Sequence, residues 1–122
     1  MRIKTESMLT DLSGTDLTSN ITGPALWLGH IAFYAIQLVF TGSPNGEFKL
    51  QASLDEPNKV NPQNTTITNW TDITGSAESV TAAGDLIWNV ENAGYTFVRV
   101  VWTDSSSGSS TITSARYSLK GV

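Results

Sequence analysis

Few residues in this chain could carry catalysis. His30 is the only histidine and cysteine is absent, so a Ser-His-Asp triad would have to use His30, and a cysteine nucleophile is excluded. His30 stands beside Gly29 between two apolar stretches, and the chain has no Gly-x-Ser-x-Gly sequence. We therefore interpret His30 as a turn residue and expect a protein that is not an enzyme.

The 11 carboxylates are scattered, and most fall in predicted turns, where aspartate caps backbone amides. A glycosidase needs two facing carboxyls in a cleft, for which a chain of 122 residues has little room. Asp55, Glu56, Asn58 and Asn61 place oxygen ligands in one segment. Calcium takes about six to eight oxygens, and the segment lacks EF-hand spacing. We interpret it as a polar loop and expect no metal and no other cofactor.

Aromatic residues form the most informative set. Exposed tryptophans on a β-sandwich can stack on sugar rings or anchor protein interfaces. Strand alternation places Tyr34, Trp88 and Trp102 on buried faces. It leaves Trp27 and Trp70 open to either role. The candidate contacts for a partner or a glycan are Trp27, Trp70, Arg99, Asp55, Glu56 and Asn58.

Arg99 stands out among these candidates because it lies mid-strand among apolar neighbours. An arginine in that setting must find a partner or extend its charged end to solvent. Two interpretations stay open: Arg99 pairs with a carboxylate across a subunit contact, or it is an ordinary solvent-facing strand residue.

Charge and hydropathy restrict the partners further. The net charge is -4 and lysine and arginine form no cluster, which disfavours nucleic acid. The apolar stretch 25–40 is shorter than the roughly 20 residues of a transmembrane helix and contains Gly29, His30 and Gln37. No apolar signal-peptide core follows the first residues. We therefore expect no membrane partner.

The elements that position these residues are predicted to be strands. Residues 25–40 fit two buried strands joined at Gly29-His30, and 33–40 should form a hairpin with 47–54 across a turn at 41–46, with Phe48, Leu50, Ala52 and Leu54 inward. Further strands are expected at 78–82, 86–90, 95–103 and 111–119, with a hairpin tip at 105–110. About seven or eight strands predict an all-β fold, a single antiparallel β-sandwich of jelly-roll or immunoglobulin-like type.

The two least regular segments are the polar N-terminus and residues 55–68. We expect residues 1–23 to form an N-terminal arm, with one short strand around residues 3–9, and residues 24–122 to form the β-sandwich domain. Such an arm can be loose alone and ordered against a neighbour. Residues 55–68 are rich in proline and asparagine, which predicts a long loop of the kind that is often functional.

Several short motifs follow one another in a recognisable order between residues 30 and 121. They are YAIQLVFTG at 34–42, GEFKLQAS at 46–53, NWTDI at 69–73, AAGD at 82–85, WNV at 88–90, AGY at 93–95, VRV at 98–100 and the final Lys120-Gly121. This order resembles that of small β-sandwich proteins encoded among the structural genes of tailed bacteriophages. The resemblance implies a virion component without cofactor or catalytic residue, and the loop at 55–68 is longer here than in that group.

Two functions stay open at this point. The first is a phage virion structural protein, a capsid decoration, cement, head-fibre or tail-associated protein that assembles in the host bacterial cytoplasm. It would contact capsid or tail subunits and form a homo-oligomer. The second is a carbohydrate-binding module that recognises a host or environmental glycan through Trp27 and Trp70. A small glycan hydrolase is the weakest alternative, because it would depend on His30 and scattered carboxylates.

Overall fold

The structure is a computed structural model that describes residues 3–7, 12, 14–29, 31–58, 60–61, 65–91, 93–105 and 108–121. The described residues form strands and no helix, so none of them forms a helix able to cross a membrane. The all-β prediction is confirmed. The strands are β1 (Ile3–Ser7), β2 (Ile21–Thr22), β3 (Leu26–Trp27), β4 (Ile31–Ser43), β5 (Gly46–Ser53), β6 (Thr71–Asp72), β7 (Glu78–Val80), β8 (Gly84–Val90), β9 (Phe97–Asp104) and β10 (Ser109–Gly121).

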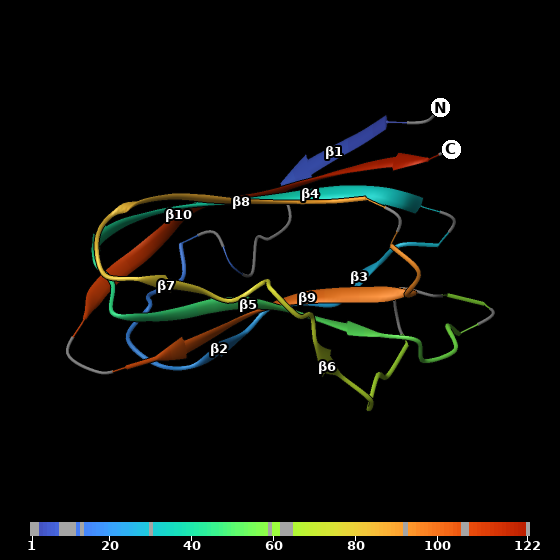
Figure 1. Cartoon of the computed structure of the whole chain (residues 1–122), viewed down its shortest axis with the longest axis horizontal. Coiled ribbons are helices and arrows are strands. Elements are labelled where there is room, and N and C mark those ends of the chain that lie inside the picture. Colours follow the sequence, from blue (N-terminus) through green and yellow to red (C-terminus); the bar gives the residue numbers. More distant parts are fainter. Residues whose placement is uncertain are drawn as a thin grey trace.

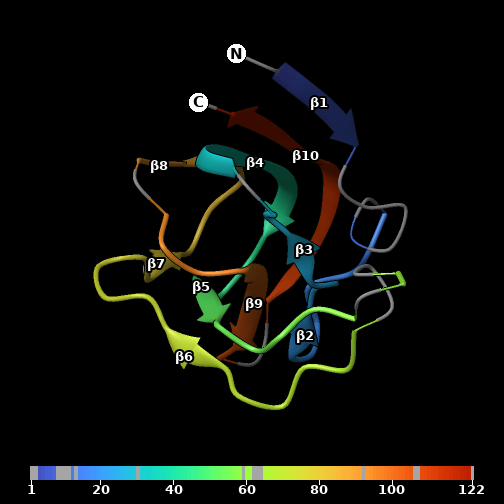
Figure 2. The same ribbon diagram turned by 90° about the vertical axis from the view of Figure 1, so that its right-hand side faces the viewer.

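The strands form two antiparallel sheets that lie face to face (Figures 1 and 2). The first, here called the β4 sheet, has the order β1-β10-β4-β8. The second, the β5 sheet, has the order β2-β9-β5-β6, with β3 also paired to β9 and β7 to β5. Because β2 and β3 both line β9, and β6 and β7 both line β5, the second sheet is four strands wide, like the first. Most connections pass from one sheet to the other, which is the arrangement of a jelly roll.

This topology corrects two sequence predictions. β4 pairs with β10 and β8, whereas β5 pairs with β9, so the turn at Pro44-Asn45 joins the two sheets and does not close a hairpin. The segment 105–110 likewise links β9 in one sheet to β10 in the other, and the predicted hairpin tip is wrong. Alternation shows which face of a strand is buried, but it does not show which strand lies beside it.

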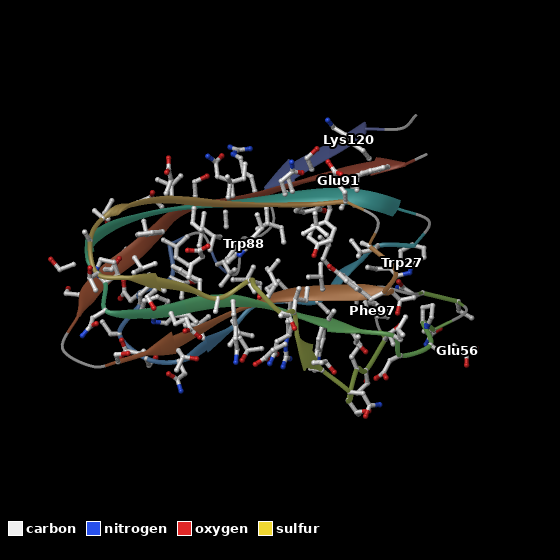
Figure 3. All side chains as sticks on the ribbon, viewed as in Figure 1. Trp27, Glu56, Trp88, Glu91, Phe97 and Lys120 are labelled. Atoms are coloured by element: carbon white, nitrogen blue, oxygen red, sulfur yellow. The ribbon has the colours of Figure 1, made fainter. Side chains whose placement is uncertain are left out.

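The core lies between the sheets and is built from inward-facing side chains of both. Phe48 of β5 packs against Trp102 of β9 with ring centroids 4.5 Å apart. Phe40 and Trp88 of the β4 sheet meet the same phenyl ring at 5.5 and 6.5 Å. Figure 3 shows Trp88 pointing into the space between the sheets. The predicted burial of Tyr34, Trp88 and Trp102 is confirmed.

Trp102 fits this core because Gly46 has no side chain. A Cβ at Gly46 would lie 2.3 Å from the Thr103 carbonyl oxygen and 2.7 Å from the Trp102 ring, closer than atoms can approach. Trp88 is fixed at its polar end, where its indole N–H donates to the Ser76 carbonyl at 2.9 Å. Buried aromatic rings are therefore positioned by backbone as well as by other rings.

The described part of the N-terminal segment packs on the sandwich, and its strand β1 agrees with the short strand expected around residues 3–9. β1 pairs with β10 along the edge of the β4 sheet, from Ile3 opposite Lys120 to Ser7 opposite Arg116. Leu12 and Leu17 are buried in the core, and the Leu17 amide donates to the Ser110 carbonyl at 2.8 Å. The described residues before Gly23 therefore lie on the sandwich and contribute to its core, because isolated leucines in a polar segment can still fill a gap between sheets.

Two irregularities break the predicted alternation. A β-bulge in β10 shifts the register between Ile112 and Ser114, so Ile112 and Ala115 are both buried although strict alternation would put residues three apart on opposite faces. In β5, Phe48 and Leu50 face inward as predicted, but Leu54 lies beyond the end of the strand and is 74% exposed. The inward position predicted for Leu54 is wrong.

We predict that Phe48→Ala lowers the free energy of unfolding by about 3–5 kcal/mol, because it empties a fully buried site that rings from both sheets contact. Urea denaturation followed by tryptophan fluorescence measures this change. Leu54→Ala removes an exposed apolar side chain and should stay within about 0.5 kcal/mol of the parent. Equal losses in both variants would contradict this description of the core.

Candidate functional site

The candidate residues other than Trp27 gather around the loop 54–70, which joins β5 to β6. The described part of this loop extends beyond the sheets at one end of the molecule (Figure 1). Asp55 organises its base: one carboxylate oxygen accepts the backbone amides of Thr68 and Asn69 at 2.8 and 3.3 Å. The other oxygen accepts the Asn69 side-chain amide at 2.9 Å. The two ends of the loop are thereby held together.

Hydrogen bonds to the charged form favour it, so the Asn69 side chain and the Thr68 backbone lower the pKa of Asp55. Asn58 performs a similar task further along, since its side-chain oxygen accepts the amides of Val60 and Asn61 at 2.9 and 3.2 Å. Its own amide donates to the Thr65 hydroxyl at 2.7 Å. Asp55 and Asn58 thus shape the backbone of the loop. Glu56 is exposed.

The structure brings Arg99 and Trp70 into direct contact. The guanidinium carbon of Arg99 lies 4.1 Å from the centroid of the Trp70 ring, a cation–π distance. The Arg99 Nε–H also donates to the Gln51 side-chain oxygen at 2.8 Å. Burial lowers the pKa of Arg99, which still stays protonated at neutral pH. Both interpretations of Arg99 from the sequence lacked this intramolecular partner.

Gln51 continues the contact across the outer face of the β5 sheet. Its side-chain amide donates to Asp72 at 2.8 Å, and Lys49 forms an ion pair with the same carboxylate at 2.9 Å. The Gln51 and Lys49 hydrogen bonds, in that order, lower the pKa of Asp72. We call Lys49, Gln51, Asp72, Arg99 and Trp70 the outer polar row. It ties β5, β6 and β9 together on the solvent side.

The sequence did not identify Lys49, Gln51 and Asp72 as part of this row. Alternation with the inward-facing Phe48 and Leu50 directs Lys49 and Gln51 outward, but the residues that lie beside them depend on strand pairing. Gln51 stands opposite Arg99 on one side and Asp72 on the other. The sequence does show that these strands carry outward-facing polar residues. It does not show which strands are neighbours, and therefore does not show that these residues contact one another.

Apolar side chains are exposed on the same loop. Leu54, directly before Asp55, is 74% exposed, and Val60 is 94% exposed. Single exposed aliphatic residues are ordinary on a protein surface, but on a connection braced by hydrogen bonds they present apolar atoms at defined positions. We call Leu54 and Val60 together with the outer polar row the loop surface.

Trp27 lies apart from the outer polar row. It stands in β3 opposite Phe97 of β9 and is half-buried (Figure 3). Gly29 is held at φ +55°, and a Cβ there would meet the Trp27 ring at 3.2 Å, so the indole lies against the backbone of the following turn. His30 lies outside the described residues. The described residues contain no group of three or more acidic, histidine or cysteine side chains able to hold a metal ion.

Comparison with known proteins finds similar folds among solved structures but assigns the chain to no family. No family model matches the chain, and the search of curated proteins found no relative. Among solved structures, the SPBc2 prophage-derived protein YomS aligns with a TM-score of 0.52 and 16% identity over 97% of this chain and 92% of its own. A chain in the structure of infectious bursal disease virus Gt strain aligns with a TM-score of 0.51 and 13% identity. That match covers 97% of this chain and 31% of the viral one.

We predict that the base of the loop loosens in acid. Because the folded-state pKa of Asp55 lies below its unfolded value, the bracing is fully present above the ordinary aspartate pKa and is lost as the pH falls through the lowered value. The amide signals of Thr68 and Asn69 should shift together in an NMR titration from about pH 6 to about pH 2. Asp55→Asn should abolish that titration and Asp72→Asn should retain it. Identical titrations in both variants would contradict the assignment to Asp55.

Proposed function

We propose that this chain is a structural protein of a virus particle and does not catalyse a reaction. More finely, it is a tailed-phage capsid decoration, cement, head-fibre or tail-associated protein that binds capsid or tail subunits and self-associates. The observation that carries the proposal is the likeness of fold to the prophage-derived protein YomS, which extends over nearly the whole of both chains. The motif order in the sequence supports the same class.

The loop surface is suited to such a contact. It presents the exposed side chains of Leu54 and Val60 on a loop that Asp55 and Asn58 hold in shape. A braced loop loses less conformational freedom on binding than a loose one, so more of the contact energy remains as affinity. The neighbouring outer polar row would supply the polar rim that surrounds an apolar contact in protein interfaces.

A glycan-binding module is the second candidate, and the observation in its favour is that Trp27 and Trp70 are half-buried and not part of the core. Arg99 already covers one face of the Trp70 ring, so a sugar could stack only on the other. Binding on a broad glycan array that Trp70→Ala or Trp27→Ala abolishes would favour this candidate over the first.

The first test asks whether the protein is part of a particle. Phage particles whose genome carries the gene are purified on a density gradient and probed with antiserum against the protein. We expect the protein to migrate with the particles and to label them in immunogold electron microscopy. A protein found only in the soluble fraction would overturn the proposal.

The second test addresses the loop surface. The double variant Leu54→Asp/Val60→Asp places charge where the contact requires apolar atoms, and we expect it to bind particles that lack the protein about tenfold or more weakly. Co-sedimentation measures the binding. Ala82→Asp is the matched control, because Ala82 is also exposed but lies between β7 and β8. Equal binding by all three proteins would remove the loop surface from the proposal.

A further inference from the structure

The edge of the β4 sheet at β8 is open in the part of the chain that the structure describes. β8 pairs there with β4 alone, continuously from Gly84 opposite Phe40 to Val90 opposite Tyr34, with no register shift. Its other side therefore carries a row of backbone N–H and C=O groups that can accept a further strand.

The other described edges carry the features that prevent strand addition. β2 and β3 have two residues each, and β6 and β7 have two and three. β1 has five residues and includes Lys4 and Glu6. Short length and charge both discourage edge-to-edge pairing. β8 has seven residues, no bulge, no proline and no lysine, so it is the edge best suited to pairing with another chain.

The outward side chains of β8 suit one particular partner strand. Asp85, Ile87 and Asn89 form its exposed row, and Ile87 is 62% exposed in the middle. The neighbour of Ile87 on β4 is Gln37, a polar residue. Ile87, at the centre of this edge strand, therefore has no apolar residue directly opposite it in its own sheet.

We propose that β8 pairs antiparallel with β8 of a second copy of this chain, about a two-fold axis through Ile87. The two four-stranded β4 sheets then join into one eight-stranded sheet. On the outer face, Ile87 meets Ile87 of the second copy, and Asp85 meets Asn89 at both ends. On the inner face, Leu86 meets Trp88. Apolar residues face apolar ones and no like charges face each other, so the strand is complementary to itself.

Other registers are less favourable. An axis through Trp88 opposes Asp85 to Glu91, and an axis through Asp85 opposes two aspartates, which repel. An axis through Leu86 opposes Asp85 to Ile87 and shortens the pairing to five residues. An axis between two residues would place inward side chains opposite outward ones and is excluded by the pleat. The axis through Ile87 alone pairs all seven residues of β8.

This inference specifies the self-association that the proposed function includes, but its test does not depend on that function. A glycan-binding protein could dimerise in the same way, and a monomer could still bind a particle through the loop surface. Failure of the dimer test therefore leaves the particle test unaffected.

The register is tested by disulfide cross-linking, for which the absence of native cysteine is convenient. In the proposed dimer, the two positions 87 are directly opposite, within about 4.5–5.5 Å between Cα atoms. The two positions 89 lie four residues apart along the strands, roughly 13 Å, which no disulfide spans. We expect Ile87→Cys to form a covalent dimer under mild oxidation. Asn89→Cys alone should not, but mixed with Asp85→Cys it should form a covalent heterodimer.

The association itself is measured by analytical ultracentrifugation of the unmodified chain. We expect a dimer at about 100 µM, and Ile87→Lys should weaken it about tenfold or more by placing two like charges opposite each other. Ile87→Val keeps an apolar β-branched residue and should retain the dimer. A monomer at that concentration, or equally fast cross-linking by the Ile87→Cys and Asn89→Cys variants, would overturn the proposal.

Discussion

The packing of Phe48 against Trp102, together with Phe40 and Trp88, is the contact on which the rest of this structure depends. The four rings come from four strands and both sheets, and the centroids of the other three lie 4.5–6.5 Å from that of Phe48. The chain has no cysteine, so no disulfide holds the sheets together. Burial of large rings must therefore supply much of the attraction between the two layers, and Gly46 is required because Trp102 occupies the space above it.

Holding the sheets together at the centre leaves their outer faces and edges available for other tasks. The connection between β5 and β6 begins and ends in the same sheet, so its length does not affect how the layers meet. It can carry exposed Leu54 and Val60 because Asp55 closes it at the base. Loops of this kind vary at little cost to stability, since the entropy of closing a loop grows slowly with its length.

The sequence predicted the class of fold and many buried faces, because alternation is a local property. Phe48, Leu50, Trp88 and Trp102 are inward as expected. It failed where pairing between distant segments decides the outcome. The turn at Pro44-Asn45 resembles a hairpin turn locally, yet joins two sheets. Arg99 contacts Trp70 and Gln51 because of the register between β5 and β9, which no local pattern in the sequence encodes. The β10 bulge, which buries both Ile112 and Ala115, likewise has no local signal in the sequence.

The division between the sheets also keeps the two proposed contacts independent. The edge at β8 belongs to the β4 sheet, whereas the loop 54–70 and the outer polar row belong to the β5 sheet. A dimer formed through β8 would use the free backbone N–H and C=O groups of β8 and the side chain of Ile87. None of these groups belongs to the loop surface. Each copy in such a dimer would therefore keep its loop free, and two weak loop contacts on one dimer would bind a repetitive particle surface more tightly than one.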